Sequence, residues 1–95
     1  MIIQYTPEAI QDLARLREFI GVKNPLAAKR IGENILAGIE KLKPFPKIGL
    51  AVQHATEPDK VRDLYVGNYT VRYLVGENLI YILRIWHGKE IEKDL

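Results

Sequence analysis

The second half of the chain contains three short runs that are rich in β-branched and aromatic residues. They span residues 61–66, 69–75 and 79–87, and glycine-containing segments at 67–68 and 76–78 separate them. Runs of this composition between turn residues predict strands, and the short connections predict antiparallel hairpins. We therefore expect a three-stranded meander around which the rest of the chain packs.

Two helices are predicted before this meander. Thr6-Pro7-Glu8 and Asn24-Pro25 each place a capping side chain before a proline at the first helical position, which is typical of a helix start. We expect helices over residues 7–20 and from residue 25 to about residue 42, with Gly21 ending the first. The short connection between them predicts an antiparallel hairpin.

Apolar residues in both segments recur every three or four positions, so each helix is expected to bury one face. The expected buried positions are Ile10, Leu13, Leu16 (or Arg17) and Ile20 in the first helix, and Ala28, Ile31, Ile35, Ile39 and Leu42 in the second. The polar residues expected to face away from the core are Gln11, Asp12, Arg15 and Glu18. Gly32 and Gly38 are expected to permit close approach to the other helix or to the sheet.

The remaining segments complete a single expected domain over residues 1–95. Residues 2–5 form a short apolar run that predicts an N-terminal strand. Three prolines exclude a continuous helix over residues 43–60, where residues 50–52 either lie on the core or form a short edge strand. A strand, a helical hairpin and a three-stranded meander predict an α+β fold, with the helices covering one face of one sheet.

The register of the last hairpin decides which side chains share a face, because side chains alternate along a strand. A three-residue turn at 76–78 pairs Val75 with Leu79, whereas a two-residue turn places one arginine on each face. We favour the three-residue turn, because it leaves one face without arginine and a core face excludes unpaired charge. The expected core face is then Tyr69, Val71, Tyr73, Val75, Tyr81, Leu83, Ile85 and His87. The expected open face is Thr70, Arg72, Leu74, Ile80, Ile82, Arg84 and Trp86, with Arg62 as a further candidate.

Composition narrows the classes of function. The 95 residues are 47% hydrophobic and 27% charged, with a net charge of +2, so a cluster of cations would matter more than the total. Cysteine is absent, which excludes disulfides, thiolate metal sites and cysteine nucleophiles. No apolar run approaches the ~20 residues that span a bilayer, and no secretory signal is visible. We expect a cytoplasmic protein.

A half-apolar, half-basic open face indicates a protein partner or a groove, because an exposed apolar patch seldom stands alone. The alternative is that Arg72 and Arg84 pair with aspartate or glutamate inside the chain.

The order and spacing of these elements resemble the RelE/ParE toxin superfamily over nearly the whole chain. The segments that carry the resemblance are Phe45-Pro46-Lys47-Ile48-Gly49, residues 61–69 and residues 82–89. The resemblance implies the toxin half of a type II toxin–antitoxin pair, neutralised by a small cognate antitoxin that lies on the helical hairpin or adds to a sheet edge. It implies no cofactor, no metal and no membrane partner.

The superfamily divides by target. RelE-like members cut mRNA on the ribosome, whereas ParE-like members inhibit DNA gyrase and lack the nuclease residues. Two positions that match arginines of the ribonuclease branch are Thr70 and Glu90, and residues 91–95 contain no terminal tyrosine. The resemblance therefore favours the gyrase branch.

No catalytic residue is favoured in this interpretation. The expected target-binding residues are Arg62, Arg72, Arg84, Trp86, His87 and Lys89. In the alternative, a ribosome-dependent endoribonuclease, Arg84, His87 and Lys89 carry the site: His87 is the acid/base, and Arg84, Lys89 and Arg72 contact phosphate. A non-toxic protein-binding module of the same fold is a third hypothesis.

Overall fold

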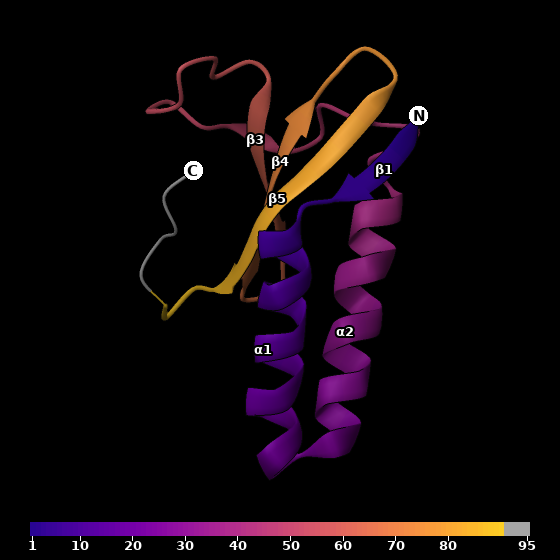
Figure 1. Cartoon of the computed structure of the whole chain (residues 1–95), viewed down its shortest axis with the longest axis vertical. Helices are drawn as coiled ribbons and strands as arrows, with labels where there is room; N and C mark the ends of the chain where they lie inside the picture. Colours follow the sequence, from indigo (N-terminus) through magenta and orange to yellow (C-terminus); the bar gives the residue numbers. More distant parts are fainter. Residues whose placement is uncertain (91–95) are drawn as a thin grey trace.

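A five-stranded sheet carries the two helices on one of its faces (Figure 1). The computed structural model describes residues 1–90. The elements are β1 (Ile2–Tyr5), α1 (Pro7–Lys23), α2 (Pro25–Glu40), β2 (Leu50–Ala51), β3 (Val61–Val66), β4 (Tyr69–Val75) and β5 (Leu79–His87). Residues 91–95, where we noted the absence of a terminal tyrosine, lie outside the described residues.

The strand order is β1-β5-β4-β3-β2. β1 runs parallel to β5, and the other neighbouring strands are antiparallel. The predicted α+β fold and the bounds of the meander strands are confirmed, and residues 50–51 form the short edge strand. Gly67 adopts φ 58° in the β3–β4 turn, a left-handed conformation that glycine reaches without strain.

The helix starts are as predicted, but the end of the first helix is not. Thr6 and Asn24 cap the two helices through their side chains. α1 continues through Gly21 to Lys23, so the expected stop at Gly21 is wrong. Asn24 is the reason, because its backbone N–H donates to the carbonyl of Ile20 while its side chain begins α2. α2 ends at Glu40, and Leu42 is still fully buried in the turn that follows.

The core lies between the helical hairpin and the covered face of the sheet, and it extends along α2 as the apolar spacing predicts. Its fully or nearly fully buried members are Ala9, Leu16, Ile35, Ile39, Leu42, Val71, Tyr73, Ile80, Ile82 and Ile85. Two expectations for α1 are wrong: Ile10 is 56% exposed and Asp12 is only 1% exposed. The buried residues of α1 are Ala9, Asp12 and Leu16. The buried face is therefore rotated about the helix axis from the predicted one, so that it includes Asp12 and excludes Ile10.

A β-bulge between β4 and β5 corrects the predicted register. Val75 pairs with Ile80 and Tyr73 with Ile82, whereas Arg72 pairs with Arg84, so Leu83 is the extra residue. An extra residue reverses the side-chain alternation along the strand. Between the turn and Leu83, the covered face therefore receives Ile80 and Ile82, which we had assigned to the open face, and Tyr81 is 36% exposed.

Beyond the bulge, the predicted alternation is correct. Val71 pairs with Ile85 in the core, and Arg72 and Arg84 are direct partners across the β4–β5 pair. Gly38 approaches β3, because a Cβ there would lie 2.8 Å from Val66 Cγ2. Among residues 1–90, no helix is long and apolar enough to cross a membrane.

Candidate functional site

The expected site residues lie at four different places, and Arg84 lies at an edge of the sheet. The pairing of β1 with β5 ends at Tyr5. Beyond that residue, α1 lies along the edge of β5 that β1 leaves unpaired. There, Asp12 accepts hydrogen bonds from Arg84 Nε at 2.8 Å and Nη2 at 3.0 Å, and from the Ile85 backbone N–H at 2.9 Å. The aspartate therefore satisfies both a guanidinium and an exposed strand edge.

The charge state of Asp12 follows from this environment. Burial acts to raise the pKa of the Asp12 carboxyl, but the hydrogen bonds from Arg84, Ile85 and Arg15 outweigh it and leave that pKa below its ordinary value. The hydrogen bond with Asp12 raises the pKa of Arg84. Both groups are therefore ionised at neutral pH, and the Arg84 charge is compensated inside the fold.

Arg72 and Trp86 lie on the face of the sheet opposite the helices. Arg72 Nε and Nη2 donate to the Asp63 carboxylate oxygens at 2.8 and 2.9 Å. The guanidinium carbon lies 5.0 Å from the centroid of the Trp86 ring. Arg72 is 2% exposed, so the pair is a buried bidentate ion pair beneath an aromatic ring. The alternative that Arg72 and Arg84 pair inside the chain is confirmed.

Arg62 forms hydrogen bonds with the segment that precedes β3. Its Nη1 donates to the Gly49 carbonyl at 2.9 Å, and its Nε donates to the Asp59 carbonyl at 3.0 Å. Gly49 is also held by Tyr73, whose hydroxyl accepts the Gly49 N–H at 2.9 Å. These bonds fix the irregular segment to the sheet at the end opposite His87 and Lys89.

His87 and Lys89 lie together in a hollow between α1 and the ends of β4 and β5, which we call the α1–β5 hollow. Its volume is about 600 Å³. Its lining residues are Arg15, Leu16, Phe19, Ile20, Tyr69, His87, Lys89 and Glu90. Apolar side chains of α1 form one wall, and aromatic and charged groups of the sheet end form the other.

The wall of this hollow is held by short-range contacts. The rings of Tyr69 and His87 meet edge to face, with centroids 5.0 Å apart. His87 Nδ1 accepts the Lys89 backbone N–H at 3.0 Å, so a neutral His87 carries its proton on Nε2. Lys89 itself is exposed. Chemically, the hollow offers an imidazole and cations beside an apolar wall.

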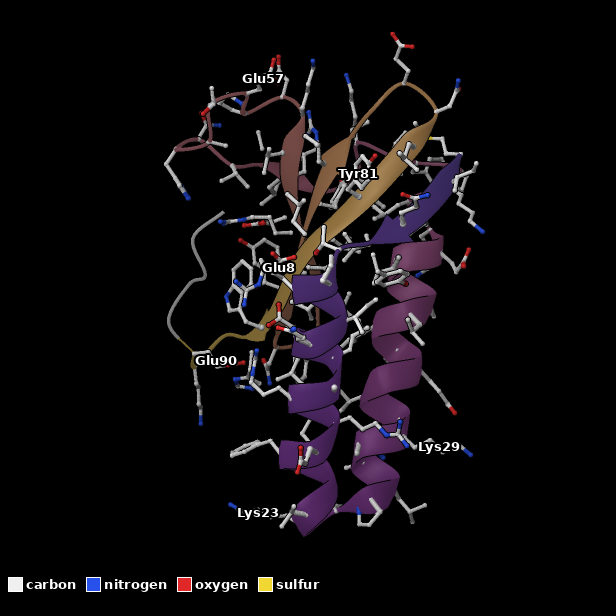
Figure 2. The ribbon with its side chains drawn as sticks, in the orientation of Figure 1. Glu8, Lys23, Lys29, Glu57, Tyr81 and Glu90 are labelled. Carbon is white, nitrogen blue, oxygen red and sulfur yellow. The ribbon has the colours of Figure 1, made fainter. Side chains whose placement is uncertain are left out.

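Glu90 is one of the lining residues of the hollow and lies beside α1 (Figure 2). One carboxylate oxygen accepts the His87 backbone N–H at 2.9 Å, and the other lies 3.0 Å from Arg15 Nη2. Arg15 also pairs with Asp12. A chain of charges therefore links Arg84, Asp12, Arg15 and Glu90 across the interface of α1 with β5.

Sequence reasoning missed Asp12, Arg15, Phe19 and Tyr69 as parts of this region. The 9-12-16 spacing of Ala9, Asp12 and Leu16 would have placed Asp12 on the buried stripe, but its acidic character suggested solvent. Among residues 1–90, no group of three or more His, Asp or Glu side chains could hold a metal ion.

Comparisons with known proteins agree on the kind of protein. The family described as the ParE toxin of type II toxin–antitoxin system, parDE, matches residues 3–92. Toxin RelE2 of Caulobacter vibrioides is 32% identical over 90 residues, covering 94% of this chain and 97% of that protein. Toxin RelE1 of the same organism is 29% identical over 82 residues, covering 86% of this chain and 87% of that protein.

A solved structure agrees on the fold. The chromosomal ParDE TA system from P. aeruginosa superposes with a TM-score of 0.76 at 23% identity, covering 92% of this chain and 95% of that one. Together with the family match over nearly the whole chain, this shows that the chain belongs to the ParE family of type II toxin–antitoxin toxins, whose members have a cognate antitoxin as partner.

Proposed function

We propose that this toxin inhibits DNA gyrase by binding it, and that it catalyses no reaction of its own. The observation that carries this proposal is that Arg72 and Arg84 are both already neutralised inside the fold. Arg72 is held by Asp63, and Arg84 by Asp12, each through two hydrogen bonds. A ribonuclease needs cations that face the scissile phosphate and gain charge complementarity as the reaction proceeds.

The positions expected to carry nuclease arginines support the same conclusion. Thr70 is 6% exposed and pairs with Trp86 across the β4–β5 pair. Glu90 places a carboxylate, already paired with Arg15, at the second of these positions, so that position supplies no cation to a phosphate. A gyrase-directed toxin acts in the cytoplasm, and we propose that location for this chain.

The rival function, a ribosome-dependent endoribonuclease, is favoured by the accessibility of the α1–β5 hollow, where His87 lies beside Lys89 and Arg15. Two assays with the same purified toxin separate the candidates: gyrase supercoiling, and mRNA cleavage on translating ribosomes. We expect inhibition of supercoiling and intact mRNA. Cut mRNA with unaffected supercoiling would overturn the proposal, and His87→Ala would then slow cleavage by ~100-fold or more.

For the cognate antitoxin, we propose the apolar groove along the helical hairpin. The groove has a volume of about 600 Å³ and is lined mainly by Leu13, Leu16, Ile20, Ala28, Ile35 and Leu36, with Arg17, Lys29 and Glu33 at its rim. An amphipathic segment would bury these side chains. In cells that produce both toxin and antitoxin, Leu36→Glu in the toxin should prevent the antitoxin from restoring growth. Leu50 is exposed and lies outside the groove, so Leu50→Glu should leave that rescue unchanged.

A further inference from the structure

We propose that the α1–β5 hollow is the surface that receives the target, and that it takes a protein segment presenting a large apolar side chain beside a carboxylate. This inference rests on the proposed gyrase-binding function. It assigns to target recognition four residues outside the expected set: Arg15, Phe19, Ile20 and Tyr69.

The apolar half of the site is a ledge on α1, by which we mean the side chains of Phe19 and Ile20. Phe19 is 70% exposed, yet it lies next to the partly buried Ile20 in the same lining. Opposite the ledge, the Tyr69 and His87 rings are fixed edge to face. A hollow of about 600 Å³ accommodates one large side chain with its neighbours, and aromatic walls of this kind supply much of the affinity at protein interfaces.

The polar half of the site is cationic. Lys89 lines the hollow, is exposed and forms no ion pair among residues 1–90. Arg15, in the same lining, is already held by Asp12 and Glu90. Outside the lining, Lys23 places its ammonium 5.9 Å from the centroid of the Phe19 ring. Among the described lining residues, Glu90 is the one acid, and its oxygens already accept the His87 N–H and pair with Arg15. The Lys89 ammonium therefore favours an incoming carboxylate over a second cation.

Contacts within the chain already hold the charged residues around the site in the absence of a partner. Asp12 holds Arg84 and the Ile85 N–H on one side and Arg15 on the other. Arg15 in turn fixes Glu90. A preformed site loses little conformational freedom on binding, which suits direct recognition of a folded target.

A second exposed apolar patch supplies matched controls. Phe45 is 62% exposed and lies with Lys47 in the segment between α2 and β2. The four variants to compare are therefore Phe19→Ala and Lys89→Glu in the hollow, and Phe45→Ala and Lys47→Glu outside it. Thermal unfolding of each variant establishes that it is folded before gyrase affinity is measured.

We expect Phe19→Ala and Lys89→Glu each to weaken gyrase binding by ~10-fold or more, and the two controls to change it by less than ~2-fold. Added salt should weaken binding of the wild-type toxin, and Lys89→Glu should lose most of that salt dependence. Equal effects of all four variants on a toxin that binds gyrase would overturn the hollow as the contact and leave the proposed function standing.

Other outcomes identify other occupants and also overturn the inference. Loss of antitoxin affinity in Phe19→Ala with unchanged gyrase affinity would assign the hollow to the antitoxin. A concentration-dependent dimer of the wild type that Phe19→Ala dissolves, again with unchanged gyrase affinity, would assign it to a second copy. A wild-type toxin that does not bind gyrase would instead remove the proposed function itself.

Discussion

Asp12 in α1 and Arg84 in β5 are 72 residues apart in the chain and form a bidentate ion pair, with N–O distances of 2.8 and 3.0 Å. The carboxylate is 1% exposed and also accepts the Ile85 N–H. β1 pairs with the first half of β5 only, so the Asp12 carboxylate acts as the hydrogen-bond acceptor for the second half of that strand edge. One side chain thus positions the helix, the strand edge and, through Arg15, the wall of the α1–β5 hollow.

Replacing Asp12 by asparagine should destabilise the fold strongly. The amide keeps the shape but leaves the Arg84 charge uncompensated at the interface, so we expect a loss of about 3 kcal/mol in the free energy of unfolding. Urea denaturation measures it, and Glu33→Gln on the exposed side of α2 is the control. A loss below about 1 kcal/mol would show that the pair contributes no more than a surface ion pair.

The same carboxylate predicts how stability depends on pH. The pKa of Asp12 in the folded chain lies below the ordinary value of 3.8, so the unfolded chain binds the proton more readily. The stabilisation is complete above the ordinary pKa and is lost as the pH falls through the folded pKa. The free energy of unfolding should decrease below about pH 4, and this decrease should be shallower in Asp12→Asn. Parallel curves for the two proteins would exclude Asp12 as its source.

The two helix caps should differ in their contribution to stability. The Thr6 hydroxyl accepts the Ala9 N–H at 3.1 Å and donates to the Leu83 carbonyl at 2.9 Å, at the bulge. Asn24 makes one exposed capping bond with its side chain, to the Ala27 N–H. Thr6→Ala should cost about 2 kcal/mol and Asn24→Ala about 1 kcal/mol. Equal losses in urea denaturation would show that the bond to Leu83 adds nothing.

Two glycines should respond to alanine with opposite signs. A Cβ on Gly49 would lie 2.7 Å from the Asp63 carbonyl oxygen and from the Tyr73 hydroxyl, whereas one on Gly32 meets nothing within 4 Å. Gly49→Ala should cost about 2 kcal/mol or more through overpacking. Gly32→Ala should gain about 0.5–1 kcal/mol through helix propensity. Thermal melting compares them, and a stabilised Gly49→Ala would contradict the packing described for that loop.

Part of the region that we propose as the target-binding surface followed from the sequence. His87 and Lys89 were predicted as candidates, and both lie in the α1–β5 hollow. Direct contact of Arg62, Arg72, Arg84 or Trp86 with a target stays a prediction, and the ion pair of Arg72 with Asp63 gives that arginine a structural role. The partners that neutralise charges come from other elements, so no local pattern could identify them.

The sequence by itself determined the elements whose causes are local. Capping side chains, prolines and turn glycines act within a few residues, and they predicted both helix starts and the bounds of β3, β4 and β5. Only the tertiary structure decided the bulge at Leu83, which exchanged the faces of Ile80 and Ile82, and the burial of Asp12. The burial of Asp12 depends on α1 lying along β5, because a buried carboxylate and an unpaired strand edge become favourable only where each satisfies the other. The bulge arises in the pairing of β4 with β5, two strands whose register no local pattern fixes.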